Sequence, residues 1–271
     1  MNIATALEQG VEALQRESIS VPRLTAEVLL AHALGCDRVH LYAHPERELT
    51  GVEQLHYGRY LYERLARKPT QYITGRQEFY GREFRVTPAV LIPRPETEIL
   101  VESALRLASG AARVLDAGTG SGCLAVTLKK EWPAARVFAS DLSPAALEVA
   151  SENARRLDAR VPFFCADLLD PCLPRWFDLI VCNPPYILPS DAAGLPAEVR
   201  EYEPPVALFG DVYLRLLRDA TRVLRPGGWL MVEIAFNARS RIEGLAGPVW
   251  EPGIVESDLA GIPRVVAWRL R

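Results

Sequence analysis

The sequence predicts an α/β protein whose mostly parallel sheet is covered by helices on both faces, with a helical segment in front of it. Two observations support this fold class. From residue 95 onward, short apolar runs that fit strands alternate with runs of helical periodicity. Before residue 75, the apolar residues recur at helical spacing. Parallel strands are buried on both faces and are therefore apolar along their whole length, so the alternation indicates a parallel sheet.

Three helices are expected within the first 75 residues. The first is indicated by four apolar residues at the spacing of one helix face: Ile3, Leu7, Val11 and Leu14. A second helix is expected between Pro22, which suits a first helical turn, and Gly35, which suits a C-cap. A third is expected over residues 52–67, because Pro69 follows as a stop.

Residues 71–93 differ in composition and predict a hairpin or an extended connector. Their aromatic and β-branched residues are interrupted by Gly75, Gly81 and Pro88, as in short strands joined by turns. Beyond them, strands are expected over residues 113–116, 136–140, 162–166, 177–182 and 229–234. Helices are expected over residues 96–108, 124–130, 144–157 and 212–224. The chain is thus expected to divide into a helical domain (1–75), a hairpin connector (76–93) and an α/β domain (94–271).

The composition is that of an ordinary soluble globular protein. Hydrophobic residues make up 49% and charged residues 24% of the 271 positions, and a chain of this length can bury a sizeable core. The net charge of −3 and the pI of about 5.9 argue against a general nucleic-acid binder, which usually carries a strong basic excess. The sequence shows no signal-peptide pattern and no apolar run near the ~20 residues that cross a membrane.

The cysteines and histidines suggest no metal or disulfide framework. The five cysteines form no C-x-x-C pair, and Cys165 and Cys182 lie in apolar runs where a buried thiol is expected. A reducing cytoplasm fits this pattern, so a cytoplasmic location is expected. The histidines lack a carboxylate or cysteine at metal spacing, which favours surface or core roles for all four: His32, His40, His44 and His56.

A glycine-rich run, V-L-D-A-G-T-G-S-G at 114–122, follows the first expected strand of the sheet and opens a helix. Gly118, Gly120 and Gly122 leave out side chains where the backbone must turn and a ligand must come close. No G-K-[ST] follows, so the run is not a phosphate-binding P-loop. Its third glycine comes one residue early for G-x-G-x-x-G, which favours a ligand without a pyrophosphate and therefore not NAD.

Two acidic residues end the next two expected strands. Asp141 lies about 20 residues beyond the glycine run, where an acid commonly accepts hydrogen bonds from a ribose. Asp167 ends the third strand. Each alone could be a helix N-cap, since Ser143 and Pro144 follow Asp141 closely. Together with the glycines, they predict one crevice at the carboxyl edge of the sheet.

The fourth expected strand of the sheet ends in Asn183-Pro184-Pro185-Tyr186. Two successive prolines remove two backbone donors and fix φ, and a residue before proline is held extended. The oxygen of Asn183 and the proline carbonyls thereby become fixed acceptors, and Tyr186 offers a flat face for a planar group. An –NH2 group held by two acceptors has its lone pair aimed along one line. Methyl transfer to nitrogen needs such positioning more than acid–base groups, because alignment alone contributes about 7–11 kcal/mol.

The chain resembles the HemK/PrmC family, the peptide-chain release-factor N5-glutamine methyltransferases, over nearly its whole length. NPPY alone also occurs in methyltransferases that act on adenine and guanine amino groups, but its combination with IPRPETE behind a helical segment is highly specific. The segments that carry the resemblance are KPTQYITG (68–75), EFYGREFRVTPAVLIPRPETE (78–98), VLDAGTGSG (114–122), VCNPPYI (181–187), EYEPPVAL (201–208), LRPGG (224–228) and DLAGIPRVV (258–266).

The resemblance implies a class I, Rossmann-like methyltransferase domain with a seven-stranded, mostly parallel sheet behind a small helical domain. It implies S-adenosylmethionine as cofactor and, as substrate, the glutamine in the Gly-Gly-Gln motif of class I release factors. The substrate would be held by Asn183, Pro184, Pro185 and Tyr186. With Asp167 from the strand-end argument, the expected cofactor-binding residues are Gly118, Thr119, Gly120, Ser121, Gly122, Asp141, Asp167, Leu168 and Asn183. No metal is expected.

Three departures from the family pattern affect the cofactor pocket. The stretch FGDVYLRLL after Leu208 is shorter than the usual glycine-rich segment that contains D-G-L. The residues AFN follow Glu233-Ile234, where a glycine and a nearby glutamine are usual. Leu168 takes a position where many relatives carry an aromatic residue.

Two alternative functions stay open at this point. The first is an N-methyltransferase that acts on an exocyclic amino group of DNA or rRNA through the same NPPY chemistry on a flipped base. The acidic pI and the lack of a Lys/Arg-rich region count against it. The second is a non-catalytic adaptor that keeps the fold, against which the intact glycine run, Asp141 and NPPY count. The helices of residues 1–75 carry no visible chemistry and are therefore expected to dock the protein substrate, with no direct nucleic acid or membrane required.

Overall fold

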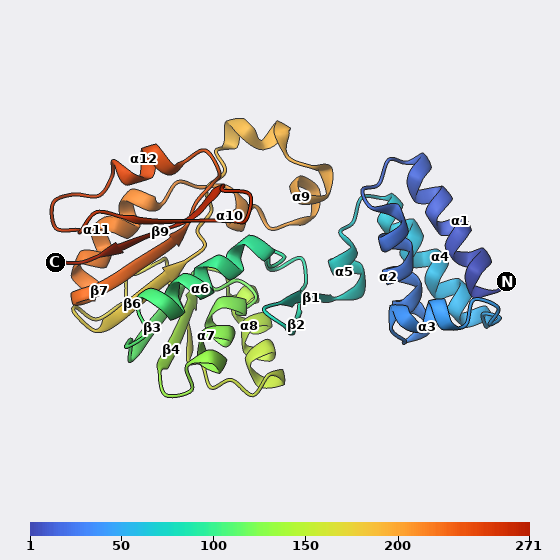
Figure 1. Cartoon of the computed structure of the whole chain (residues 1–271), viewed down its shortest axis with the longest axis horizontal. Coiled ribbons are helices and arrows are strands. Elements are labelled where there is room, and N and C mark those ends of the chain that lie inside the picture. Colours follow the sequence, from blue (N-terminus) through green and yellow to red (C-terminus); the bar gives the residue numbers. More distant parts are fainter. The chain divides into compact units, whose positions relative to one another are not determined.

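The computed structural model describes residues 1–271, which separate into two compact units. The first, here called the helical unit, comprises Met1–Arg76 together with Pro196–Tyr202. The second, here called the sheet unit, comprises Gln77–Leu195 and Glu203–Arg271 (Figure 1). Residues 196–202 thus pack with a part of the chain that lies far from them in sequence, outside the boundary expected for the first domain.

The helical unit is built from short helices, several of which have well-formed caps. Asn2 accepts a hydrogen bond from Thr5 N at 2.9 Å, and Thr50 and Glu53 form a reciprocal capping box. Gly35 ends the second helix in the left-handed region, at φ 65°. The helices are α1 (Ile3–Arg16), α2 (Pro22–Leu34), α3 (Arg38–Ala43), α4 (Gly51–Leu65), α5 (Thr70–Thr74) and α9 (Ala197–Tyr202).

The core of the helical unit confirms the three expected helices. Their inward side chains are buried, among them Ile3 and Leu14 of α1, Leu29 and Leu30 of α2, and Tyr57 of α4. Helix α3, which buries Leu41, had not been expected. The short helix α9 joins them through Arg64, which is 4% exposed and pairs with Glu198, and through Tyr202, whose hydroxyl donates to Ala66 O at 2.6 Å. These two contacts explain why α9 belongs to the helical unit.

The sheet unit contains a seven-stranded sheet in the order β5-β4-β3-β6-β7-β9-β8. Its first five strands pair in parallel, and β9 runs antiparallel to both β7 and β8, so the predicted seven-stranded, mostly parallel sheet is confirmed. The strands are β3 (Arg113–Ala117), β4 (Arg136–Asp141), β5 (Phe163–Cys165), β6 (Phe177–Cys182), β7 (Leu224–Glu233), β8 (Ile254–Ser257) and β9 (Pro263–Arg269).

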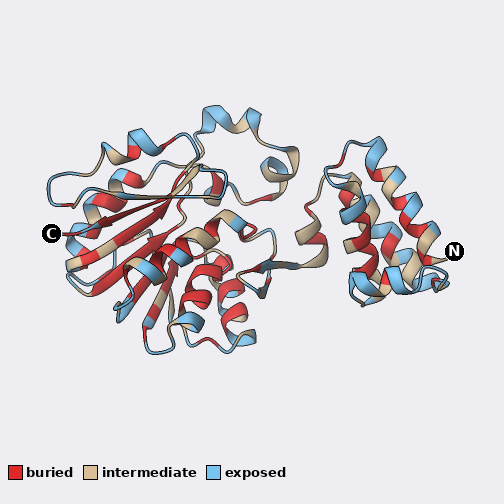
Figure 2. Cartoon of the chain, viewed as in Figure 1, coloured by how far each residue is buried: buried red, intermediate tan, exposed pale blue.

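Helices cover both faces of this sheet (Figure 2). Alternate residues of one strand enter different cores: Leu179 and Val181 of β6 pack on one side, and Ile180 and Cys182 on the other. The first side is covered by α6 (Glu98–Leu107), α7 (Cys123–Glu131) and α8 (Pro144–Arg156). The second is covered by α11 (Tyr213–Val223) and α12 (Arg239–Glu243). Shorter helical segments are η1 (Pro95–Thr97), η2 (Pro189–Gly194) and α10 (Pro205–Leu208).

The five strands expected from the apolar runs are present, as are the four expected helices. The predicted hairpin is also present, as β1 (Arg76–Phe79) and β2 (Arg82–Arg85) around a Tyr80-Gly81 turn with both φ angles positive. Residues 71–74, however, belong to helix α5 rather than to an extended segment. Strands β8 and β9 had not been expected from the apolar pattern.

The cysteines are free thiols, and Cys182 is buried as expected. The expectation for Cys165 was wrong, because its side chain is exposed at the end of the short strand β5. No helix is both long and apolar enough to span a bilayer.

Candidate active site

A cavity of about 260 Å³ is lined by residues that follow four neighbouring strands of the sheet. Gly118 follows β3, Asp141 ends β4, Asp167 follows β5 and Asn183 follows β6. The chain runs from β3 outward to β4 and β5 and then returns to β6 on the other side of β3. Ligands of open α/β sheets bind at such a reversal of strand order, beyond the carboxyl ends of the strands. The size approaches the lower end of small-molecule sites, ~300–1,000 Å³.

The glycine run forms one wall of this cavity and is held tightly to the sheet. The amides of Gly118 and Thr119 both donate to Ser140 O, at 2.8 and 2.9 Å. Gly122 has φ 82°, and a Cβ there would lie 3.1 Å from the Cβ of Ala150, so only glycine suits the position. The backbone of the loop is therefore fixed before any ligand arrives.

A buried acid, Asp116, supports the loop from beneath. Its Oδ2 accepts from the Thr119 hydroxyl at 2.6 Å and from Ala125 N at 3.1 Å. Burial raises the pKa of Asp116 to about 7, while the bonds from Thr119 and Ala125 lower it. Asp116 lies within the glycine-rich motif, but sequence reasoning gave it no role.

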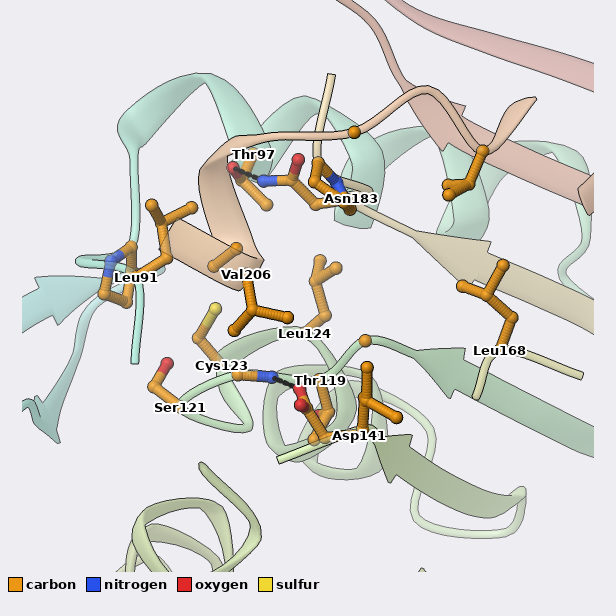
Figure 3. A pocket seen from close by; sticks show the side chains of 18 of the residues that line it. Leu91, Thr97, Thr119, Ser121, Cys123, Leu124, Asp141, Leu168, Asn183 and Val206 are labelled. Carbon is orange, nitrogen blue, oxygen red and sulfur yellow. Dashed lines mark hydrogen bonds between the residues drawn. The ribbon is translucent and has the colours of Figure 1, made fainter. Parts of the chain in front are cut away.

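Asp141 holds the same loop from the side (Figure 3). Its Oδ2 accepts from Gly120 N at 2.8 Å and its Oδ1 from Ser143 N at 2.9 Å. The cap of α8 is Ser143, whose side chain accepts from Ala146 N, so Asp141 is not a helix cap. A carboxylate offers about four lone-pair sites, which leaves Asp141 capacity to accept from a ligand in the cavity.

Asp167 and Leu168 also line the cavity. The carboxylate of Asp167 pairs with Arg215 of α11 at 2.8 Å, which directs it toward a partner on the protein. Leu168 takes φ 52°, a left-handed conformation that a leucine rarely adopts. The backbone therefore makes a sharp turn here, which sets the Leu168 side chain against the cavity.

Asn183 is held by a chain of two hydrogen bonds. Its Nδ2 donates to Thr97 Oγ1 at 3.2 Å, and the Thr97 hydroxyl donates to Glu233 Oε2 at 2.6 Å (Figure 3 shows the first bond). Asn183 Oδ1 makes no hydrogen bond within the chain. Asn183 lines the cavity, and its Oδ1 is an acceptor that no group of the chain uses.

The other NPPY residues take different positions. Pro185 lines the cavity together with Asn183, and Gly210 packs so closely on it that a Cβ there would lie 2.9 Å from Pro185 Cγ. Pro184 is buried and Tyr186 is half-buried, and neither is among the lining residues. Burial raises the pKa of Tyr186 above its usual range.

Glu233, at the end of β7, is 3% exposed and makes no ion pair. Burial raises the pKa of its carboxyl to about 7, and the hydrogen bonds from Thr97 and Tyr186 lower it. Glu96 raises the same pKa through its charge, and Arg264 lowers it. Glu233 is therefore linked to Asn183 through the Thr97 hydroxyl, and Tyr186 acts on its carboxyl directly.

The comparisons with known proteins fit this site. Residues 5–75 match the PrmC N-terminal domain, and residues 95–194 match the methyltransferase small domain. A release factor glutamine methyltransferase from Koribacter versatilis is 46% identical over 99% of both chains. One from Geobacter sulfurreducens is 44% identical over 95% of this chain and 93% of its own. The chain belongs to the release factor glutamine methyltransferase family.

The fold also matches solved methyltransferase structures. A T. thermophilus 16S rRNA methyltransferase superposes with a TM-score of 0.53 at 20% identity, covering 72% of this chain and 50% of its own. A ribosomal protein L11 methylase from Lactobacillus delbrueckii gives a TM-score of 0.50 at 22% identity, over 72% of this chain and 88% of its own. Membership of the release factor glutamine methyltransferase family and the observed sheet order therefore agree on one fold.

Two long-range pairs start from the segment IPRPETE (92–98), which carries part of the family resemblance. Arg94, in IPRPETE, pairs with the buried Glu203, in EYEPPVAL. Thr97, also in IPRPETE, bonds to Glu233. The segment that departs from the family pattern after Leu208 also contributes, since Phe209 and Gly210 line the cavity. Sequence reasoning missed the Arg94–Glu203 and Thr97–Glu233 pairs because no local pattern identifies partners more than 100 positions apart.

Proposed function

We propose that this chain transfers a methyl group from S-adenosylmethionine to the side-chain amide nitrogen of the glutamine in the Gly-Gly-Gln motif of class I release factors. Family membership supports the reaction and the substrate class. The observation that carries the chemical argument is the unused acceptor of Asn183 beside the glycine run. An acceptor fixed in that position suits a planar –NH2 donor.

The residues around the cavity fit this cofactor. Asp141, with its remaining acceptor sites, would bind the ribose hydroxyls, and the backbone of residues 118–122 would hold the methionine portion. Leu142, Ala166 and Leu168 give an apolar surface for the adenine. When bound, S-adenosylmethionine supplies an electrophilic methyl group on a sulfonium. The amide nitrogen would form the new bond to this carbon, S-adenosylhomocysteine would leave, and the nitrogen would lose one of its two protons to solvent.

The chain's own residues would position the amide nitrogen. Asn183 Oδ1 and the Pro184 carbonyl would accept the two hydrogens of the substrate –NH2, which leaves the nitrogen lone pair free along one direction. Pro184 and Pro185 restrict the backbone that carries these acceptors. Tyr186 would support the planar amide from the side. This arrangement acts by alignment, which can contribute about 7–11 kcal/mol without any acid–base group.

We assign the helical unit to docking of the release factor, with residues 1–75 as the docking domain and 76–93 as the connector to the catalytic domain (94–271). Several large apolar side chains of this unit are exposed: Val39, Val52, Leu55 and Tyr62. Apolar surface of this kind on a unit without catalytic residues suits contact with a protein partner. The site needs no direct nucleic acid and no membrane in this proposal.

Mass spectrometry of a class I release factor, incubated with the protein and isotope-labelled S-adenosylmethionine, tests the proposal. One labelled methyl group should appear on the glutamine of the Gly-Gly-Gln motif. Ribosomal RNA and duplex DNA belong in parallel reactions. Labelled nucleic acid with an unlabelled release factor would reject the amide substrate in favour of an amino group on a base. No label on any substrate, despite measurable cofactor binding, would favour the adaptor function.

A further inference from the structure

We propose that Thr97 and Glu233 are positioning residues that determine which way the side-chain amide of Asn183 faces. The inference rests on the proposed amide methylation and deepens it. It concerns whether the substrate –NH2 meets Oδ1 of Asn183, which accepts, or Nδ2, which does not. Thr97 lies in η1 and Glu233 ends β7, so two separate elements act on the residue that follows β6.

Asn183 needs such an anchor because its backbone does not fix its amide. The prolines that follow restrict φ and ψ, but the terminal torsion of an asparagine side chain is broad and roughly two-fold. Turning the amide over exchanges Oδ1 for Nδ2 at nearly no change in shape. A turned amide would present a donor to the donor hydrogens of the substrate, and the nitrogen would lose its alignment.

Counting donors shows how the orientation is set. A threonine hydroxyl has one hydrogen, and that of Thr97 goes to Glu233 Oε2 at 2.6 Å, the length of a bond to a charged oxygen. Thr97 Oγ1 therefore has only lone pairs left for Asn183. Asn183 can satisfy them only with Nδ2, as observed at 3.2 Å, and Oδ1 remains for the substrate.

The charge of Glu233 decides the direction of this chain of bonds. An ionised Glu233 can only accept, so Thr97 must donate to it. A protonated Glu233 can donate to Thr97 Oγ1, and Thr97 can then donate to Asn183 Oδ1, which turns the amide over. The chain of bonds thus has two directions, of which only the one with an ionised Glu233 leaves an acceptor for the substrate.

The groups that face Glu233 come from several elements. Thr97 and Tyr186 donate to its carboxylate, Glu96 of η1 and Arg264 of β9 act through their charges, and Tyr213 of α11 donates to its backbone oxygen at 3.1 Å. Their combined effect with burial places the pKa of Glu233 at about 7. The productive direction is then present above that pH and is lost as the pH falls below it.

If Glu233 served mainly to stabilise the fold, Glu233→Gln would lower the melting temperature. Burying a carboxylate without an ion pair costs stability, so an uncharged side chain of the same shape is not expected to destabilise the fold. Glu233→Gln should therefore keep the melting temperature or raise it. If its turnover falls at the same time, the carboxylate serves the site rather than the fold.

The test compares three threonine variants in steady-state kinetics with a release factor. Thr97→Val removes the hydroxyl at similar volume, and Thr97→Ser keeps it. Thr127→Val is the matched control, because the buried Thr127 hydroxyl has no hydrogen-bond partner and does not line the cavity. Thr97→Val should lower kcat by about 10–100-fold with a smaller change in KM, by comparison with residues that orient ligand-binding groups elsewhere. Thr97→Ser should stay within about 3-fold of wild type, since the hydroxyl that acts through Asn183 remains.

Two further measurements distinguish a positioning role from a general loss of folded structure. The side-chain –NH2 of Asn183 should be protected from hydrogen exchange by NMR in the cofactor-free wild type and in Thr127→Val, and unprotected in Thr97→Val. The kcat of the wild type should fall as pH drops through about 7, and Glu233→Gln should lose this dependence. Equal kcat and equal protection in Thr97→Val and Thr127→Val would overturn the inference. A wild type that leaves the release factor unmethylated would instead overturn the proposed function.

Discussion

Asp141→Ala should weaken the binding of S-adenosylhomocysteine, the unreactive product form of the cofactor, by about 10–150-fold. In the structure the carboxylate already accepts from Gly120 N and Ser143 N and keeps about two further acceptor sites for a ribose. A hydrogen bond to a charged group contributes about 1.5–3 kcal/mol. One such bond lost corresponds to that range of affinity, at about 1.4 kcal/mol per tenfold.

Isothermal calorimetry measures this change directly, and Asp167→Ala is the matched control. The Asp167 carboxylate also belongs to the cavity wall, but it is half exposed and pairs with Arg215. Because its carboxylate is already engaged by Arg215, Asp167 offers the cofactor less than Asp141 does, and Asp167→Ala should change the affinity far less. Asp141→Asn should rescue only in part, because its –NH2 would face one of the two backbone donors. A folded Asp141→Ala protein with wild-type affinity would refute the reasoning.

Three further predictions concern other parts of the chain. Asn183→Ala should lower kcat by about 10²–10³-fold, as for removal of a preorganised polar group, and wild-type turnover in steady-state assays would reject the proposed acceptor. Leu55→Glu, on the exposed face of the helical unit, should raise KM for a whole release factor but not for a short Gly-Gly-Gln peptide; equal effects on both would argue against docking there. Gly122→Ala should lower stability by about 1–2 kcal/mol or more in chemical unfolding, because φ is 82° and Ala150 leaves no room, and an unchanged unfolding midpoint would contradict that.

The sequence was most informative where structure depends on local pattern. Strand β6 was predicted with its observed bounds, because five of its six residues are apolar and Asn183-Pro184 follows it directly. Strand β8 escaped notice because its side chains are only partly buried at the edge of the sheet, so it lacks a continuous apolar run. The exposure of Cys165 could not be predicted either, because it is the last residue of the short strand β5 and its neighbours in sequence are apolar.

The site divides in the same way. Asp141 and Asn183 were predicted because each ends a strand, and a strand end fixes where a residue lies at the sheet edge. Thr97 and Glu233 are 136 positions apart, and their contact exists only after the sheet has formed. A sequence shows that Glu233 is an acid at the end of an apolar strand, but not which hydroxyl it meets.

The chemistry proposed here requires two independent degrees of freedom to be fixed, and the chain uses different means for each. The backbone after β6 is restricted by Pro184 and Pro185 through the covalent geometry of proline, which acts wherever those residues stand. The amide torsion of Asn183 cannot be fixed covalently. It depends on the two hydrogen bonds by which Asn183 donates to Thr97 and Thr97 donates to Glu233. A variant that keeps NPPY but loses Thr97 would therefore retain a rigid backbone with an amide free to turn. Because an NPPY motif alone does not supply the second constraint, the presence of that motif is a weaker predictor of activity than NPPY together with the Thr97–Glu233 pair.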